Sequence, residues 1–332
     1  MQDSGSIRFH AARARAVAAL TALAAAGVLL AACGSSSKST TSSSTSAAGT
    51  TTTSSAASGP GAGKPAVTLG DKNFAEENIL GQLYAQALRA KGYTVNLKSE
   101  IGSTELIYKA LKAGSIDGYP EYTGVLLSAV GNQVKPPTSA DVAYEEAKAL
   151  VEKVGFTLLD KTPFFDTNVL ITLPSYASAH KLASIADLKP LGTKVKLGGP
   201  PEFATRAEGL PGIKAAYGIS PTFVPVAIEL SYTALEGGRV NVQNAFSTDG
   251  QLLGGKFKEL ADPKNVFGFQ NVAPVIKQSV VEAEGPAFAE TMNKVSALLT
   301  IPAIQQMNKA VSIEKQPPET VAKEFLKANG LA

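Results

Sequence analysis

The sequence predicts an α/β protein whose folded body has two lobes, each built on a mostly parallel sheet, joined by two crossover segments. Strand-like and helix-like patterns alternate after residue 66, the order typical of parallel sheets with right-handed crossovers. A pattern Tyr-x-Ala-Leu-x-x-Gly-x-(Ile/Val)-(Asp/Asn) begins at Tyr108 and again at Tyr232, so we expect equivalent elements in which both tyrosines pack a helix on its sheet. Apolar runs from Phe164 and from Asn265 could carry the chain between the lobes and back.

The head of the chain, residues 1–32, has the pattern of an export signal. Three arginines precede an apolar run from Ala16 to Leu30, which is shorter than the roughly 20 residues that a membrane-spanning helix needs. The segment ends in Leu30-Ala31-Ala32-Cys33, which resembles a bacterial lipobox. Cys33 is the only cysteine, so we predict that it is lipidated; the alternative is a lone buried cysteine.

Residues 33–65 are predicted to form a disordered tether. Ser, Thr, Ala and Gly dominate them, and such a composition buries too little apolar surface to fold. A diacylated Cys33 would hold the folded body at a membrane by lipid chains alone. Three arginines and one aspartate in residues 1–32 account for two of the three formal positive charges. The remaining chain has no Lys/Arg run, so we expect no nucleic-acid partner. We also expect the protein to be a monomer.

The first lobe is assigned to residues 66–165 plus 272–332. A buried strand at Val67–Leu69 leads through "DKNF" into a helix, where Asn73 and Glu76 have the spacing of a capping box. Glu76 and Glu77 stand in the first turn, where the helix dipole alone accounts for two acidic residues. The apolar positions of this helix recur at helical spacing: Ile79, Leu80, Leu83, Tyr84, Ala87 and Leu88.

Further elements complete this lobe. A strand at Tyr93–Leu97, a helix at Ser103–Lys112 and a strand at Ile116–Tyr119 finish a βαβαβ unit. Three C-terminal segments have helical patterns and are expected to return to the first lobe: 286–299, 301–311 and 319–328.

The second lobe is assigned to residues 166–271. It contains a strand at Lys194–Gly199, a helix at Pro201–Tyr217, a second helix at 229–238 and a strand at 239–246. Ligands bind beyond the carboxyl ends of strands in such sheets, and two crossovers allow the lobes to close on a ligand by a hinge motion.

No motif in the sequence demands catalysis. His180 is the only histidine after the predicted signal, and no Gly-x-Ser-x-Gly is present. There is no Cys/His metal pattern, and the run Gly250–Phe257 has Phe257 where a phosphate-binding loop needs Ser or Thr. We therefore expect no enzyme activity, no metal and no cofactor; a hydrolase on the same scaffold lacks a nucleophile–base pair.

Five segments carry a family resemblance: "DKNFAEENILGQLYAQALRAKGY", "GSTELIYKAL", "GSIDGYPEYTG", "EFATRAEGL" and "AFSTDGQL". In content and order they resemble the substrate-binding proteins of osmoprotectant ABC importers, the quaternary-amine type that binds glycine betaine, choline or carnitine. The resemblance implies a type II-like periplasmic-binding-protein fold whose two crossover strands form a hinge. It also implies a lipid-anchored extracytoplasmic receptor that delivers a small-molecule solute to a permease and its ATPase.

The resemblance further implies an interlobe aromatic cage for a trimethylammonium group, held by cation–π attraction. Tyr119 is expected as a cage wall, Thr123 as a hydroxyl donor and Arg206 as the clamp on a carboxylate tail, unless Arg206 forms a structural salt bridge. Lys72 stands at a helix start that suits an anion, or is a surface lysine. Phe246 precedes "STDG", where relatives often carry Tyr.

Other positions are left with two interpretations. Ser103 and Thr104 are N-caps or ligand neighbours, Tyr122 lines the cleft or packs beneath it, and Thr248 shapes its loop or touches ligand. Relatives carry a tyrosine in the first crossover, where this sequence has Asn168. The second crossover provides Phe269 as a candidate aromatic residue of the cage. Such a cage would have less π-electron density than the tyrosine-rich cage of relatives. Two other functions therefore stay open: binding of a different small polar or aromatic solute, or a lipoprotein that senses or scaffolds without transport.

Overall fold

The computed structural model describes residues 59–332, so the predicted signal, Cys33 and most of the predicted tether lie outside the described residues. Within the described range no helix is both long and apolar enough to span a membrane.

The first sheet has the strand order β2-β1-β3-β10-β4. Its strands are β1 (Val67–Gly70), β2 (Val95–Lys98), β3 (Gly118–Tyr122), β4 (Phe156–Leu158) and β10 (Val272–Lys277). β1 pairs in parallel with β2 and β3, whereas β10 runs antiparallel to β3 and β4. The last strand in sequence thus lies inside the sheet, beside β3.

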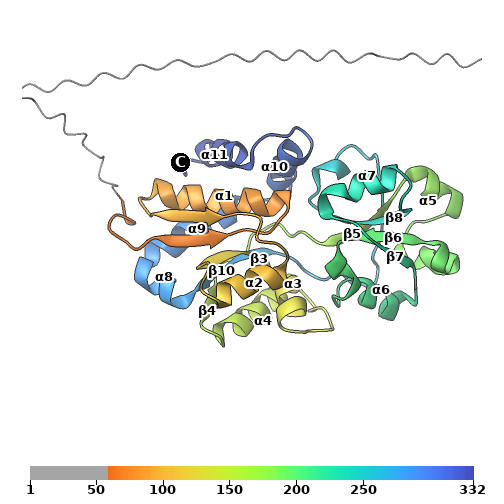
Figure 1. Ribbon diagram of the computed structural model, residues 1–332, viewed down its shortest axis with the longest axis horizontal. Coiled ribbons are helices and arrows are strands. Elements are labelled where there is room, and N and C mark those ends of the chain that lie inside the picture. Colours follow the sequence, from red (N-terminus) through yellow and green to blue (C-terminus); the bar gives the residue numbers. More distant parts are fainter. Residues whose placement is uncertain (1–58) are drawn as a thin grey trace, which may run out of the picture. The chain divides into compact units, whose positions relative to one another are not determined.

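Helices cover both faces of this sheet (Figure 1). On one face lie α1 (Ala75–Ala90), α9 (Pro286–Leu298), α10 (Ile301–Ser312) and α11 (Pro318–Ala328); on the other lie α2 (Thr104–Lys112), α3 (Thr123–Val125) with the π-helical turn Leu126–Val130, and α4 (Ala140–Glu152). A further helix, α8 (Gln278–Glu284), follows β10. Separate apolar cores fill the two faces, one around Leu83 and one around Ile107.

The second sheet has the order β7-β6-β8-β5-β9. Its strands are β5 (Asn168–Thr172), β6 (Lys196–Gly199), β7 (Thr222–Pro225), β8 (Val242–Phe246) and β9 (Lys258–Leu260). The helices α5 (Pro174–His180), α6 (Leu210–Tyr217) and α7 (Ser231–Glu236) accompany it, together with 3₁₀ segments at Ile185–Lys194, Pro201–Ala204, Ile228–Leu230 and Gly250–Leu252. β6 is parallel to β7 and β8, and β5 is antiparallel to β8 and β9.

The two sheets repeat one topology, which explains the repeated sequence pattern. β3 and β8 hold the same third place in their sheets, and each follows a helix that begins the pattern, α2 or α7. Tyr108 packs edge-on against Phe156 with ring centroids 5.9 Å apart, and Tyr232 packs against Phe257 at 5.0 Å. Tyr108 therefore has the packing role that its position predicts, whereas Tyr232 packs on Phe257 but also lines a cavity and donates a hydrogen bond to Asp249.

The two crossovers lie side by side. Phe165 and Asn271 form an isolated antiparallel bridge, and the amide of Asp166 donates to the carbonyl of Gln270 at 3.0 Å. Helix α10 makes another link between the lobes, because the Asn308 side chain donates to the carbonyl of Thr248 at 2.9 Å. The lobes are thus joined by a paired strand segment and by a C-terminal helix.

Three local expectations need correction. The strand expected at 116–119 runs from Gly118 to Tyr122, and the helix expected over 201–217 is a 3₁₀ turn followed by α6. Helix α1 has Phe74 at its N-cap without a side-chain cap, so the Asn73–Glu76 capping box is absent. The reason is that the Glu76 carboxylate is buried and bound by other side chains.

The α1 face of the first sheet should be sensitive to cavities. Leu83 is fully buried against this sheet, so Leu83→Ala should lower the free energy of unfolding by about 2–5 kcal/mol in urea denaturation. Leu106→Ala on α2 is the control, because its side chain is 55% exposed and should cost under ~1 kcal/mol. Equal losses in the two variants would contradict this assignment of the core.

Candidate functional site

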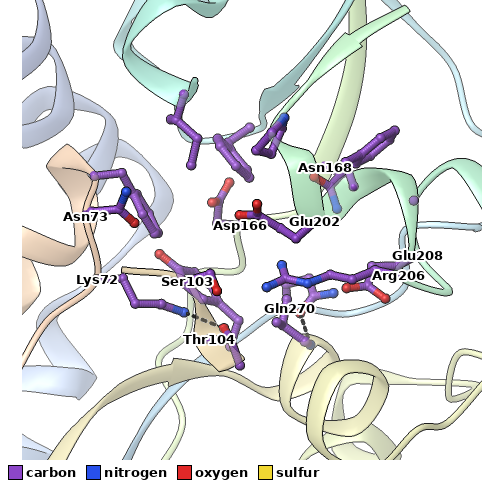
Figure 2. A pocket seen from close by; sticks show the side chains of 18 of the residues that line it. Lys72, Asn73, Ser103, Thr104, Asp166, Asn168, Glu202, Arg206, Glu208 and Gln270 are labelled. Carbon is purple, nitrogen blue, oxygen red and sulfur yellow. Dashed lines mark hydrogen bonds between the residues drawn. The ribbon is translucent and has the colours of Figure 1, made fainter. Parts of the chain in front are cut away.

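A pocket lies where the carboxyl ends of parallel strands in both lobes meet, as expected for such sheets. Lys72 follows β1, Tyr122 ends β3, Glu202 and Arg206 follow β6, and Phe246 ends β8. The pocket has a cavity volume of about 60 Å³ and is partly open to solvent. Figure 2 shows its polar side chains converging from both lobes.

Three aromatic rings form a stack in this pocket. Phe74 lies between Tyr122 and Phe246, with centroid distances of 6.2 Å and 5.9 Å and interplanar angles of 26° and 12°. Phe74 and Tyr122 come from the first lobe and Phe246 from the second. The stack brings π-electron faces from both lobes to one place.

The ammonium group of Lys72 is already paired. Its Nζ lies 2.6 Å from Glu121 Oε1 and 3.5 Å from Glu77 Oε1, and it donates to Thr104 Oγ1 at 3.4 Å (Figure 2). The same Nζ sits 4.4 Å from the centroid of the Tyr122 ring. The same Nζ lies 5.8 Å from the centroid of the Phe74 ring, so Lys72 contacts two rings of the stack, and the Glu121 carboxylate competes with any ligand anion for it.

Glu76 fixes the other end of Tyr122. The Tyr122 hydroxyl donates to Glu76 Oε1 at 2.8 Å, while Thr248 Oγ1 and Asn308 Nδ2 donate to Glu76 Oε2 at 2.5 Å and 2.7 Å. Burial raises the pKa of Glu76, and these hydrogen bonds oppose the rise. Burial, followed by the charge of Glu76, raises the pKa of Asp166 well above its usual range. Of these two buried acids, Asp166 lines the pocket, whereas Glu76 lines the adjoining cavity.

Arg206 makes a two-point ion pair across the lobes. Its Nε donates to Glu105 Oε1 at 3.1 Å and its Nη2 to Glu105 Oε2 at 3.0 Å. Arg206 follows β6 in the second lobe, and Glu105 stands in the first turn of α2 in the first. Partial burial raises the pKa of Glu105, but the hydrogen bonds from Arg206 and Ser103 prevail and bring it to about 2.

Glu208, unlike Glu105, is an acid of the pocket without an ion-pair partner in the described residues. Its side chain lines the pocket and is 6% exposed, yet neither carboxylate oxygen has a hydrogen-bond partner within residues 59–332. Burial raises the pKa of Glu208, and the nearby Ser128 hydroxyl and Arg206 charge only partly oppose this. A buried acceptor left without a donor inside the protein can take one from a ligand.

The structure brings seven of the predicted residues together in the pocket and places four elsewhere. The lining includes Lys72, Ser103, Thr104, Tyr122, Asn168, Arg206 and Phe246. Asn168 accepts from the Asn244 side chain at 2.8 Å, and Ser103 holds Glu105 rather than capping α2. Thr248 lies in an adjoining cavity behind the aromatic stack, bound to Glu76.

Tyr119 does not reach the pocket. It is 1% exposed in the core beneath α2 and α4, and its hydroxyl donates to Glu121 Oε2 at 3.0 Å. Alternate strand residues face opposite sides of a sheet, so the strand that continues to Tyr122 brings that ring, not Tyr119, to the pocket. Thr123 donates to the carbonyl of Phe269, and the Phe269 ring packs on the same core as Tyr119.

Several lining residues were not anticipated as site residues: Phe74, Asp166, Glu202, Phe203, Glu208 and Gln270. A signal for Phe74 was present, because it follows Lys72 inside the "DKNF" motif. Glu208 similarly stands two residues after Arg206. In the described part of the chain no group of three or more His, Cys, Asp or Glu could hold a metal ion.

Comparison with known proteins gives a consistent result. Residues 65–328 match a family described as "Substrate binding domain of ABC-type glycine betaine transport system". A "Glycine-betaine-binding protein" of Pseudomonas aeruginosa is 32% identical over 275 residues, which cover 79% of this chain and 88% of that protein. The Escherichia coli "Glycine betaine-binding protein YehZ" is 30% identical over 277 residues, 80% of this chain and 90% of that protein.

A solved structure titled "Crystal structure of glycine betaine/carnitine/choline ABC transporter" aligns with a TM-score of 0.65 at 23% identity, covering 80% of this chain and 99% of that one. This likeness shows the fold. The matches confirm both the family resemblance and the two-lobed α/β fold predicted from the sequence.

The buried acid Glu77 should make stability depend on pH. Burial raises its pKa to about 8, so the stability that comes from its proton is fully present below about pH 4.5 and is lost as the pH rises through 8. Glu77→Gln cannot ionise and leaves Lys72 paired with Glu121, so its free energy of unfolding should fall less over this window than that of the parent chain. The largest possible difference in slope is about 1.4 kcal/mol per pH unit.

Urea denaturation of both chains at several pH values measures this difference. Glu324→Gln, an exposed change on α11, is the control and should follow the parent profile. Parallel profiles for the parent and Glu77→Gln would show that Glu77 does not retain its proton.

Proposed function

Because this chain belongs to the substrate-binding family of ABC-type glycine betaine transport systems, we propose that it is the solute receptor of an ABC importer and binds a quaternary ammonium solute between its lobes. The observation that carries the proposal is the aromatic stack of Phe74, Tyr122 and Phe246, which lies in a pocket contributed by both lobes. The names of the two similar proteins, both glycine betaine binders, support the same solute class.

The chemistry of the pocket suits a trimethylammonium group. Such a group has no N–H to donate, so π faces and fixed negative charge must recognise it. A desolvated cation–π contact contributes about 2 kcal/mol or more. Asp166, Glu202 and Glu208 add carboxyl groups to the lining, while both lining cations are paired with acids. To enter the stack, the ligand would have to separate Tyr122 or Phe246 from Phe74 and take the place of that ring against Phe74.

Delivery to a permease would follow from lobe closure. A solute that contacts both lobes stabilises the closed arrangement over the open one, and the paired crossovers supply the bend. The permease would recognise the closed pair of lobes. In this proposal the lipid on Cys33 and the tether of residues 33–65 hold a monomeric receptor at the extracytoplasmic face of the cell membrane. One lobe of the receptor consists of residues 66–165 with 272–332, and the other of residues 166–271.

Calorimetric titration of the purified full chain with glycine betaine, choline, carnitine and proline betaine tests the solute class. We expect heat and a rise in melting temperature with at least one of them. Absence of both signals with all four would contradict binding of quaternary amines while leaving the fold intact.

The role of the aromatic stack has its own test. Phe246→Leu keeps apolar volume but removes a π face, so it should weaken binding of any bound quaternary amine by roughly 30-fold, the equivalent of about 2 kcal/mol. Phe257→Leu is the control, since Phe257 is a buried aromatic of the same lobe that does not line the pocket. An unchanged dissociation constant in Phe246→Leu would remove this ring from the binding site.

A further inference from the structure

We propose that the pocket selects quaternary ammonium solutes whose far end donates a hydrogen bond, such as a hydroxyl or an N–H, over solutes that end in a carboxylate, and that Glu105 and Glu208 set this preference. The inference rests on the function proposed above and specifies its solute class. Two observations carry it: the ion pair that occupies Arg206, and the buried Glu208 carboxylate, whose oxygens have no hydrogen-bond partner within residues 59–332.

Glu105 takes the place of a ligand carboxylate. An arginine fork binds one carboxylate with two parallel N–H bonds, and the Nε and Nη2 donors of Arg206 both go to Glu105, at 3.1 Å and 3.0 Å. The Arg206 side chain is 17% exposed, and Lys72, the other cation of the lining, is held by Glu121 and Glu77. A betaine tail would have to displace Glu105 to find a free cation.

Glu208 favours a ligand group that donates a hydrogen bond and disfavours a carboxylate. Both of its oxygens are buried on the same wall as Arg206 (Figure 2), and within residues 59–332 neither has a hydrogen-bond partner at normal bonding distance, although the Ser128 hydroxyl lies nearby. A ligand carboxylate nearby would add like charge, whereas a hydroxyl or N–H would supply the missing bond. Glu202, which also lines the pocket, increases the penalty for a second anion.

Choline and glycine betaine are matched probes for this idea. They share the trimethylammonium group and differ at the other end, where choline has a hydroxyl and glycine betaine a carboxylate. A variant that changes folding or lobe closure changes the binding of both ligands by the same factor. The ratio of the two dissociation constants is therefore unaffected by such changes. The parent chain should bind choline at least about tenfold more tightly.

Two variants should move this ratio for different reasons. Glu208→Gln removes the charged acceptor and presents an amide donor, so choline should weaken about tenfold while glycine betaine holds or improves. Glu105→Gln releases the Arg206 fork, so glycine betaine should improve by about tenfold or more relative to choline. Glu324→Gln on α11, far from the pocket lining, should leave the ratio unchanged.

The measurement is calorimetric titration of the full-length chain and each variant with both probes. Tighter binding of glycine betaine to the parent chain, or a ratio that neither variant moves, overturns the inference while the proposed function stands. Failure of both probes to bind the parent chain overturns the inference as well, and the wider panel of quaternary amines then decides the proposed function separately.

Discussion

The Glu76 carboxylate lies where the first lobe, the second lobe and helix α10 meet, and it accepts a hydrogen bond from each of them. Burying a carboxyl group is costly unless its lone pairs are bound, and Glu76 meets this cost by accepting from three donors at once, Tyr122, Thr248 and Asn308. This one constraint holds the Tyr122 ring at the pocket, sets the position of the loop after β8 and seats α10 across the joint between the lobes.

The pocket around this joint is organised by pairing its charges before any solute arrives. Lys72 is held by Glu121 and Glu77, and Arg206 by Glu105. Such pairing fixes both long side chains, which then frame the aromatic stack instead of presenting free cations to solvent. The stack itself takes rings from both lobes, so in the proposed receptor solute recognition and lobe closure would depend on the same side chains.

The sequence predicted the two-lobed fold, five of the ten described strands and the repeated unit, because those depend on local periodicity and on turn residues. The roles of Tyr119 and Tyr122 did not follow, because β3 continues to Tyr122, which places Tyr119 inside the sheet and Tyr122 at the carboxyl end of the strand beside the pocket. The Glu105–Arg206 pair joins residues far apart in sequence, and nothing local in "GSTELIYKAL" or "EFATRAEGL" encodes their contact. Glu76 and Glu77 were assigned to the helix dipole, which explains acids at a helix start but not their burial.

The place of β10 inside the first sheet has a consequence for the order in which the lobes can be completed. All strands of the second sheet come from residues 168–260, so that sheet can close while the segment that follows it is still unfolded. The first sheet lacks the neighbour that joins β3 to β4 until Val272–Lys277 is in place. When the chain becomes available for folding from its N-terminal end, the lobe that begins first is therefore completed last, and one edge of β3 stays unpaired until then.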